Sequence, residues 1–383
     1  MALLTDNFDT ATSLDSLFAA HKKALKGKRN NYFATYFDFN LASQLNKLHS
    51  ELVAGTYRPY AYRKKVITEP KTRLIEAPAY RDRIVHHALH NQLCPFYEKH
   101  FIDDSYACRP GKGIHHAAAR VQYFLRQSCT GTFVCQIDIS KYYASINHGK
   151  LLEILQTKIK DEPLINLLKI IIESTDSGTE HDFLFDINSH YFTKGRRGIP
   201  IGNLTSQLFA NIYLHQADMY AKQKLKIQHY VRYMDDILFF SNSKDELRKW
   251  QQSMISFLYD ELYLTVNPRK VRLYPTSQGV SFVGYVIHPR YLLLRSGSVR
   301  RFKKRYNKQL KAMMNEKISL ETLRDSFASW KAHAAHASTE RLVDKMEALQ
   351  QDYLFVREVR RYYYKRFPKA KPPPIQLSFF DEE

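Results

Sequence analysis

The sequence has no long apolar run and few cysteines, and both absences narrow the class of protein. No stretch reaches the roughly 18 apolar residues that a membrane-spanning helix needs. The sequence also does not begin with the charged segment and apolar segment that are typical of a signal peptide. We therefore expect a soluble, cytoplasmic protein with no membrane partner. The four cysteines, Cys94, Cys108, Cys129 and Cys135, lack the C-x-x-C spacing of zinc or redox sites and are too few for a disulfide framework, so we expect reduced thiols.

Acidic residues are also in short supply. The 383 residues include 58 Lys and Arg against 38 Asp and Glu, which gives a formal charge of +20 at neutral pH. A surface with this excess of positive charge attracts polyanions, and nucleic acid and an anionic membrane face are the main candidates. The hydrophobic fraction of 44% is ordinary for a globular chain, and the length allows two or three packed units.

Hydrophobic periodicity divides the chain into four parts, with bounds 1–130, 131–290, 291–368 and 369–383. The first part is expected to be mostly helical, with short strands near Tyr60–Ile67 and Arg73–Ala77. The second alternates strand-like and helical stretches, with one helix over Leu151–Thr175. The third is helical and basic: residues Arg295 to Lys371 contain 20 Lys and Arg and 8 Asp and Glu. The fourth is a Pro-rich linker with a terminal peptide.

Two acidic positions carry the strongest chemical signal. Asp138 ends the β-rich run Gly131–Ile139, and Asp235 and Asp236 lie between the two apolar runs of His229–Ser241, as in a hairpin with an acidic tip. An Asp after a strand is most often a helix N-cap, and an Asp in a hairpin is most often a turn residue. Two adjacent carboxylates between apolar strands repel each other without a cation, so we favour a metal site. Nucleotidyl transfer needs such carboxylates to hold two divalent ions about 3.5–4 Å apart.

These motifs resemble those of reverse transcriptases. Tyr233–Asp236 (YMDD) resembles the catalytic box of that family, and QIDISKYYASI, which contains Asp138, resembles its first acidic motif. The resemblance extends from about Tyr57 to His336. It implies an RNA-directed DNA polymerase that uses an RNA template, a DNA primer and dNTPs, with two Mg²⁺ ions held by the three aspartates and the backbone of Ile139. Mn²⁺ remains an alternative ion.

The resemblance also implies a fold. It is the α+β, right-hand polymerase fold, with N-terminal helices and fingers in 1–130, a palm built on an antiparallel sheet in 131–290, and a helical, basic thumb in 291–368. Fingers and palm are interleaved in sequence.

Several residues match positions where the family contacts the incoming nucleotide. Tyr143 lies where the family has an aromatic gate against the ribose 2′-OH, and a helix-core aromatic is the alternative. Gly202 and Gln207, in GRRGIPIGNLTSQ, resemble the box that lines the nucleotide and template, where glycine permits close backbone approach. Lys71 and Arg73 resemble the fingers residues that clamp the triphosphate, with ordinary surface charge as the alternative.

Further matches concern the leaving group and the duplex. Lys270 lies where the family often has a lysine that protonates pyrophosphate. Gly284, in SFVGYVI, resembles the primer-grip hairpin. A cluster of cations on an expected helix favours contact with a phosphate backbone over a solvated face, since no acid follows until Glu316. The cluster consists of Arg300, Arg301, Lys303, Lys304 and Arg305.

Finer features resemble the diversity-generating retroelement and group II intron enzymes. Tyr80–Ala118 resembles their fingers, and Ile201 and Gln207 in the palm box are typical of the retroelement group. Ala332 in the thumb departs from the Gly expected there. This subtype implies adenine-directed errors and a small basic accessory protein as partner. An antiviral defence-associated or retron-like enzyme that uses a structured non-coding RNA stays open, and intact acids disfavour a non-catalytic RNA-binding module.

The C-terminal segment contains two further signals. Val356–Lys371 mixes cations with aromatic residues, which suits either stacking on unpaired bases or a core helix. The peptide QLSFF resembles the motif by which bacterial replication proteins dock on the sliding clamp, and packing on the chain's own surface is the alternative. The candidate clamp-binding residues are Gln376, Leu377, Phe379 and Phe380.

Overall fold

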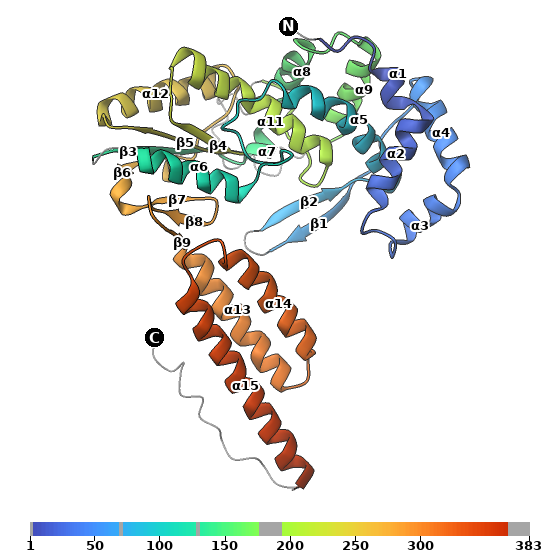
Figure 1. Cartoon of the computed structure of the whole chain (residues 1–383). Helices are drawn as coiled ribbons and strands as arrows, with labels where there is room; N and C mark the ends of the chain where they lie inside the picture. The colour runs from blue at the N-terminus through green and yellow to red at the C-terminus, as the bar shows by residue number, and fades with distance from the viewer. Residues whose placement is uncertain (1–2, 69–71, 128–130, 176–193, 367–383) are drawn as a thin grey trace. The chain divides into compact units, whose positions relative to one another are not determined.

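The computed structural model describes residues 3–68, 72–127, 131–175 and 194–366 (Figure 1). The chain divides into two compact units: Met1–Ala117 with Cys129–Pro275, and Ala118–Ser128 with Thr276–Glu383. Lys71 and the four candidate clamp-binding residues lie outside the described residues. No helix in the described ranges is long and apolar enough to cross a membrane.

Helices and one strand pair form the N-terminal part of the first unit. Helices α2 and α5 pack together and bury Leu17, Ala20 and Leu89 in the unit's core. Strands β1 and β2 pair antiparallel, at the positions that the sequence predicts. The elements are α1 (Phe8–Thr12), α2 (Leu14–Leu25), α3 (Tyr32–Phe39), α4 (Leu41–Val53), β1 (Arg63–Ile67), β2 (Arg73–Ala77), α5 (Tyr80–Glu98) and α6 (Ile114–Gln127), of which α6 continues into the second unit.

A four-stranded antiparallel sheet with strand order β4-β5-β3-β6 lies at the centre of the first unit. The strands are β3 (Phe133–Asp138), β4 (Tyr230–Tyr233), β5 (Asp236–Ser241) and β6 (Arg272–Pro275). Because β3 and β5 are inner strands, their side chains Cys135, Ile137 and Phe239 are fully buried. Helix α12 (Lys244–Asp260) contacts both inner strands (Figure 1). The predicted α+β class with an antiparallel sheet is confirmed.

Helices between the strands complete the first unit. They are α7 (Tyr142–Ser145), α8 (His148–Gln156), α9 (Glu162–Ile172), α11 (Leu204–Met219) and the π-helical turn η2 (Tyr220–Lys224), and the 3-10 turn η3 (Pro268–Lys270) precedes β6. The single helix expected over Leu151–Thr175 is two helices. The break occurs because Asp161 caps α9 through the amide of Leu164, and Pro163 fits only the first turn of a new helix.

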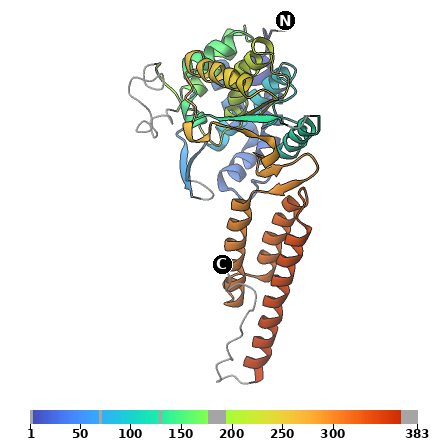
Figure 2. The same cartoon turned by 90° about the vertical axis from the view of Figure 1, so that its left-hand side faces the viewer.

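The second unit has its own core. A three-stranded meander, β7 (Val280–Phe282), β8 (Tyr285–Ile287) and β9 (Leu292–Leu294), precedes three helices that lie side by side (Figure 2). They are α13 (Ser296–Met314), α14 (Leu320–Ala334) and α15 (Glu340–Arg366). Phe302, Tyr306 and Leu310 recur every four residues on α13 and bury one face of it, so its cations are left on the other faces.

Candidate active site

Strand pairing brings the three predicted acids together. Asp138 is the last residue of β3, Asp236 is the first of β5, and the two are directly opposite each other. Opposed residues on antiparallel strands point to the same face, with Cβ atoms about 4.5–5.5 Å apart. The amide of Ile139 donates to the carbonyl of Asp235 at 3.4 Å. The backbone therefore holds the acidic turn against the end of β3.

The turn that carries Asp235 is tight. Tyr233 pairs with Asp236, which leaves Met234 and Asp235 as a two-residue loop. Met234 has a φ of 54°, a left-handed conformation that costs a non-glycine residue about 1–3 kcal/mol. Such a conformation persists only where the surrounding structure fixes it, and it aims Asp235 next to Asp138.

The electrostatics of the three acids call for a cation. Burial raises the pKa of Asp235, the nearby Asp138 carboxylate raises it further, and Lys270 and Arg73 lower it in part. Lys270 Nζ lies 2.5 Å from Asp138 Oδ2, and Gln136 Nε2 donates to Asp236 Oδ1 at 2.9 Å. Charged oxygens that repel each other at the ends of two neighbouring strands are suitable ligands for Mg²⁺ or Mn²⁺.

The acids do not form a closed metal cage by themselves. Among the described residues, no group of three or more His, Cys, Asp or Glu side chains is arranged to hold a metal ion. Two of the three aspartates contact neighbouring side chains instead, Asp138 with Lys270 and Asp236 with Gln136. The donor chemistry fits a divalent ion, and an ion that binds Asp138 Oδ2 would take the place of Lys270.

Tyr143 and Arg73 lie within electrostatic reach of this cluster. The hydroxyl of Tyr143 is 3.8 Å from Met234 Sδ. Burial raises the pKa of Tyr143 most, the charges of Cys108 and Asp235 raise it further, and Arg73 lowers it. The preceding Tyr142 is a core residue, since it is fully buried and its hydroxyl donates to the carbonyl of Ala210. Two adjacent tyrosines on α7 thus have different surroundings.

The palm-box residues lie where β2 meets α11. The amide of Glu76 donates to the carbonyl of Ile201 at 3.0 Å, and a Cβ on Gly202 would meet the carbonyl oxygen of Glu76 at 2.8 Å. Gly202 has a φ of +137°, so the close approach of the chain's own strand requires glycine there. Gln207 is exposed in the first turn of α11.

The remaining predicted residues belong to the second unit. Gly284 and Val283 form the two-residue turn between β7 and β8, both with positive φ, so glycine meets the need of a hairpin turn. The five cations predicted to contact nucleic acid all lie on α13: Arg300, Arg301, Lys304 and Arg305 are exposed, and Lys303 is half-buried.

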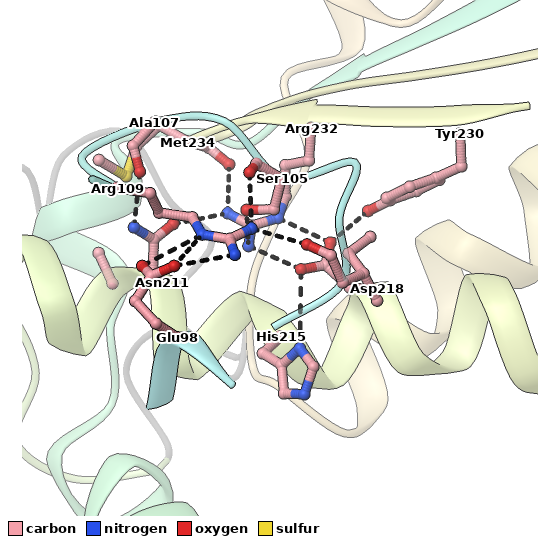
Figure 3. A network of polar contacts seen from close by, with 12 residues as sticks. Glu98, Ser105, Ala107, Arg109, Asn211, His215, Asp218, Tyr230, Arg232 and Met234 are labelled. Carbon is pink, nitrogen blue, oxygen red and sulfur yellow. Dashed lines mark hydrogen bonds and ion pairs between the residues drawn. The ribbon is translucent and has the colours of Figure 1, made fainter. Parts of the chain in front are cut away.

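A buried network beneath the acidic turn is a feature that the sequence predictions do not include (Figure 3). Arg232 is fully buried, and its Nε and Nη2 each lie 2.7 Å from the carboxylate of Asp218. Its Nη1 donates to the carbonyl of Met234 at 3.2 Å. Ser105 and Asn211 accept further hydrogen bonds from the same guanidinium.

The network therefore ties the strained turn to α11 through a charge pair. The sequence contains a signal for it: Arg232 interrupts an apolar strand and Asp218 a largely apolar helix, and a charge in a buried element needs a partner.

Comparison with known proteins assigns the family. Residues 62–287 match the family described as reverse transcriptase (RNA-dependent DNA polymerase). Protein YkfC of Escherichia coli strain K12 is 26% identical over 287 residues, which cover 66% of this chain and 73% of YkfC. The group II intron-encoded protein LtrA of Lactococcus lactis subsp. cremoris is 23% identical over 342 residues, which cover 72% of this chain and 54% of LtrA. The chain thus spans about half the length of the intron protein.

Among solved structures, the telomerase of Candida albicans in complex with a fragment of telomeric RNA matches with a TM-score of 0.44 and 12% identity, over 82% of this chain and 63% of that chain. The telomerase of Candida tropicalis without ligand matches with a TM-score of 0.44 and 14% identity, over 80% and 66% of the two chains. The family match covers more than half of the 383 residues and includes all three aspartates. The chain therefore belongs to the reverse transcriptase family, the RNA-dependent DNA polymerases.

Proposed function

We propose that this chain copies RNA into DNA by nucleotidyl transfer, with two Mg²⁺ ions held by Asp138, Asp235, Asp236 and the backbone of Ile139. The observation that carries the proposal is the pairing of Asp138 with Asp236, which places acids from two segments beside Asp235. When bound, the ions polarise the α-phosphate of the incoming nucleotide and neutralise the departing pyrophosphate. Mn²⁺ can take the same oxygen ligands.

Side chains around the acids supply the other functions. Lys270, which neutralises Asp138 in the free chain, is free to donate a proton to pyrophosphate once metal replaces it. Arg73, together with Lys71, neutralises triphosphate charge, and its influence on the pKa of Asp235 supports that role. Tyr143 selects deoxynucleotides by steric exclusion of the 2′-OH, and Gly202 and Gln207 line the nucleotide and the template.

The second unit holds the duplex. Four of the five predicted cations on α13 are exposed and the chain carries a formal charge of +20, which supports contact with phosphates of the template and primer. The hairpin turn at Gly284 offers a backbone without a side chain to the primer. The C-terminal peptide Gln376–Phe380 is proposed to dock on a sliding clamp.

The subtype proposal rests on the palm box. Ile201 and Gln207 favour a diversity-generating retroelement enzyme, with adenine-directed errors and a small basic accessory protein. An antiviral defence or retron-like enzyme with a structured non-coding RNA is the alternative. Sequencing the DNA that copurifies with the protein from its host separates the two alternatives. The DNA product of a retroelement enzyme is expected to be a copy of a repeat with mutations at adenine positions.

Primer extension tests the polymerase proposal. Wild type should extend a DNA primer on an RNA template with dNTPs and Mg²⁺, and Asp235→Ala and Asp236→Ala should each lower the rate by at least about a thousandfold, since each removes a metal ligand. Asp245→Ala is a matched control, because Asp245 is 82% exposed on α12 and pairs only with Arg248 among the ion pairs of the described residues. Unchanged extension in either palm variant would end the polymerase proposal.

A further inference from the structure

Helix α3 presents aromatic rings to solvent. Five of its eight residues are aromatic, yet of these only Phe37 is buried. The other four are 75%, 48%, 53% and 89% exposed: Tyr32, Phe33, Tyr36 and Phe39. We call these four residues the α3 aromatic surface. Single exposed hydrophobic residues scattered over a surface are normal, but a contiguous group of them marks a binding site. The exposed rings grouped on this short helix therefore indicate a binding surface.

The sequence around the α3 aromatic surface is strongly basic. Between Ser16 and Ser50 the chain has six Lys and Arg residues and one acid, Asp38. The carboxylate of Asp38 lies 2.9 Å from His21 Nε2, so the one acid in this stretch already has a partner. The local field therefore favours an anionic ligand.

Cations also flank the α3 aromatic surface. Lys28 and Arg29 are exposed in the turn before α3, and the hydroxyl of Thr35 donates to the carbonyl of Arg29 at 2.9 Å, which holds that turn against the helix. On the other side, the guanidinium carbon of Arg63, on β1, lies 4.6 Å from the centre of the Phe33 ring. Rings flanked by cations match the composition of sites that stack bases and neutralise phosphates.

We propose that the α3 aromatic surface binds an unpaired stretch of RNA outside the polymerase site. Unpaired bases expose the faces that rings stack on, whereas a duplex hides them. Tyr32 and Tyr36 are nearly parallel, with 23° between planes and centroids 6.4 Å apart. The surface lies outside the family match at 62–287, on helix α3, which is apart from the central sheet (Figure 1). The proposal rests on the proposed function for the source of the strand, which is the RNA template or an RNA partner.

The test compares binding with catalysis in the full chain. A fluorescent 15-nucleotide oligouridylate is titrated into wild type, into the variant Tyr32→Ala/Tyr36→Ala/Phe39→Ala, and into Phe18→Ala. Phe18 is a matched control because it is another exposed ring, 39% exposed beside Lys22 on α2, that does not belong to the four rings of the α3 aromatic surface. Loss of one stacking ring weakens binding by about 5- to 150-fold, so the triple variant should bind at least about tenfold more weakly, while Phe18→Ala binds as wild type does.

Further arms identify the ligand and separate this proposal from the polymerase proposal. A blunt RNA duplex and vesicles with one third anionic lipid should bind wild type and triple variant equally, and extension of a fully annealed short primer–template should be unchanged. Equal oligouridylate affinity in wild type and triple variant would overturn the proposal, as would a loss confined to vesicles or to single-stranded DNA. Asp235→Ala should retain the RNA binding, so a chain without polymerase activity still tests this surface.

Discussion

Replacing Arg232 by methionine should damage both stability and catalysis, and the two effects can be separated. The change keeps an unbranched side chain about as long as the apolar stem of arginine, but it removes the guanidinium group and leaves Asp218, which is fully buried, without its cation. Removing one partner of a buried ion pair costs about 3–5 kcal/mol, against a total stability of about 5–15 kcal/mol for a typical domain. The first unit should still fold at low temperature, with a much lower urea midpoint.

The second effect concerns the acidic turn. Arg232→Met also removes the donor to the carbonyl of Met234, a residue held at a φ of 54°. A displacement of about 1 Å at catalytic groups can cost about a hundredfold in rate. We therefore expect kcat of primer extension to fall by about ten- to a hundredfold, with the KM for template–primer nearly unchanged.

Two further variants isolate the positioning effect. Arg232→Met/Asp218→Leu replaces the ion pair by apolar groups and should recover most of the lost stability without recovering kcat. Arg81→Met is the matched control, since Arg81 is a largely buried cation that pairs with Glu51 and Asp82, neither of which contacts the Arg232 network in the described ion pairs. It should lower the urea midpoint with kcat kept. Wild-type kcat in the double variant would refute the reasoning.

The remaining predictions address single sites. Gly202→Ala should destabilise the chain by at least about 1–3 kcal/mol in urea unfolding, because its Cβ would meet the carbonyl of Glu76 at 2.8 Å; Gly27→Ala, at a positive φ with open space, should cost less. The raised pKa of Asp235 means that the folded, metal-free chain binds this proton more tightly than the unfolded chain does. Its contribution to stability is therefore lost as pH rises from the ordinary value of 3.8 through the raised pKa. Asp235→Asn should melt at a higher temperature than wild type at pH 7 without metal, and a lower melting temperature would contradict this. Tyr143→Ala should incorporate ribonucleotides at least about tenfold more readily relative to deoxynucleotides, measured by kcat/KM for each; an unchanged ratio would assign Tyr143 to packing alone.

The sequence predicts the catalytic hairpin well, because local signals agree there. Two apolar runs around Asp235 and Asp236 require strands, and two residues between them require a tight turn. The position of Asp138 at the end of a strand is also predicted from local signals. Its position opposite Asp236 depends on which strands pair, and the family resemblance supplied that expectation rather than the periodicity.

Features that depend on contacts between distant segments of the chain could not be predicted from the sequence. The sequence suggests that Gly202 is a glycine because a ligand approaches it. The structure shows that position 202 requires glycine because of the carbonyl of Glu76, on a strand distant in sequence. Arg232 and Asp218 each signal a buried charge, but only the fold shows that they are partners. The exposure of the aromatic residues on α3 could not be predicted either, since their pattern in the sequence alone suits a core helix.

A structure of the complex with an RNA template, a DNA primer lacking its 3′-OH, a matching dNTP and Mn²⁺ tests the central claim most directly. The account predicts two anomalous-scattering peaks about 3.5–4 Å apart, in contact with Asp138 and Asp235 and with Lys270 displaced from Asp138. Manganese bound elsewhere, or Lys270 still in contact with Asp138 while nucleotide is bound, would contradict it.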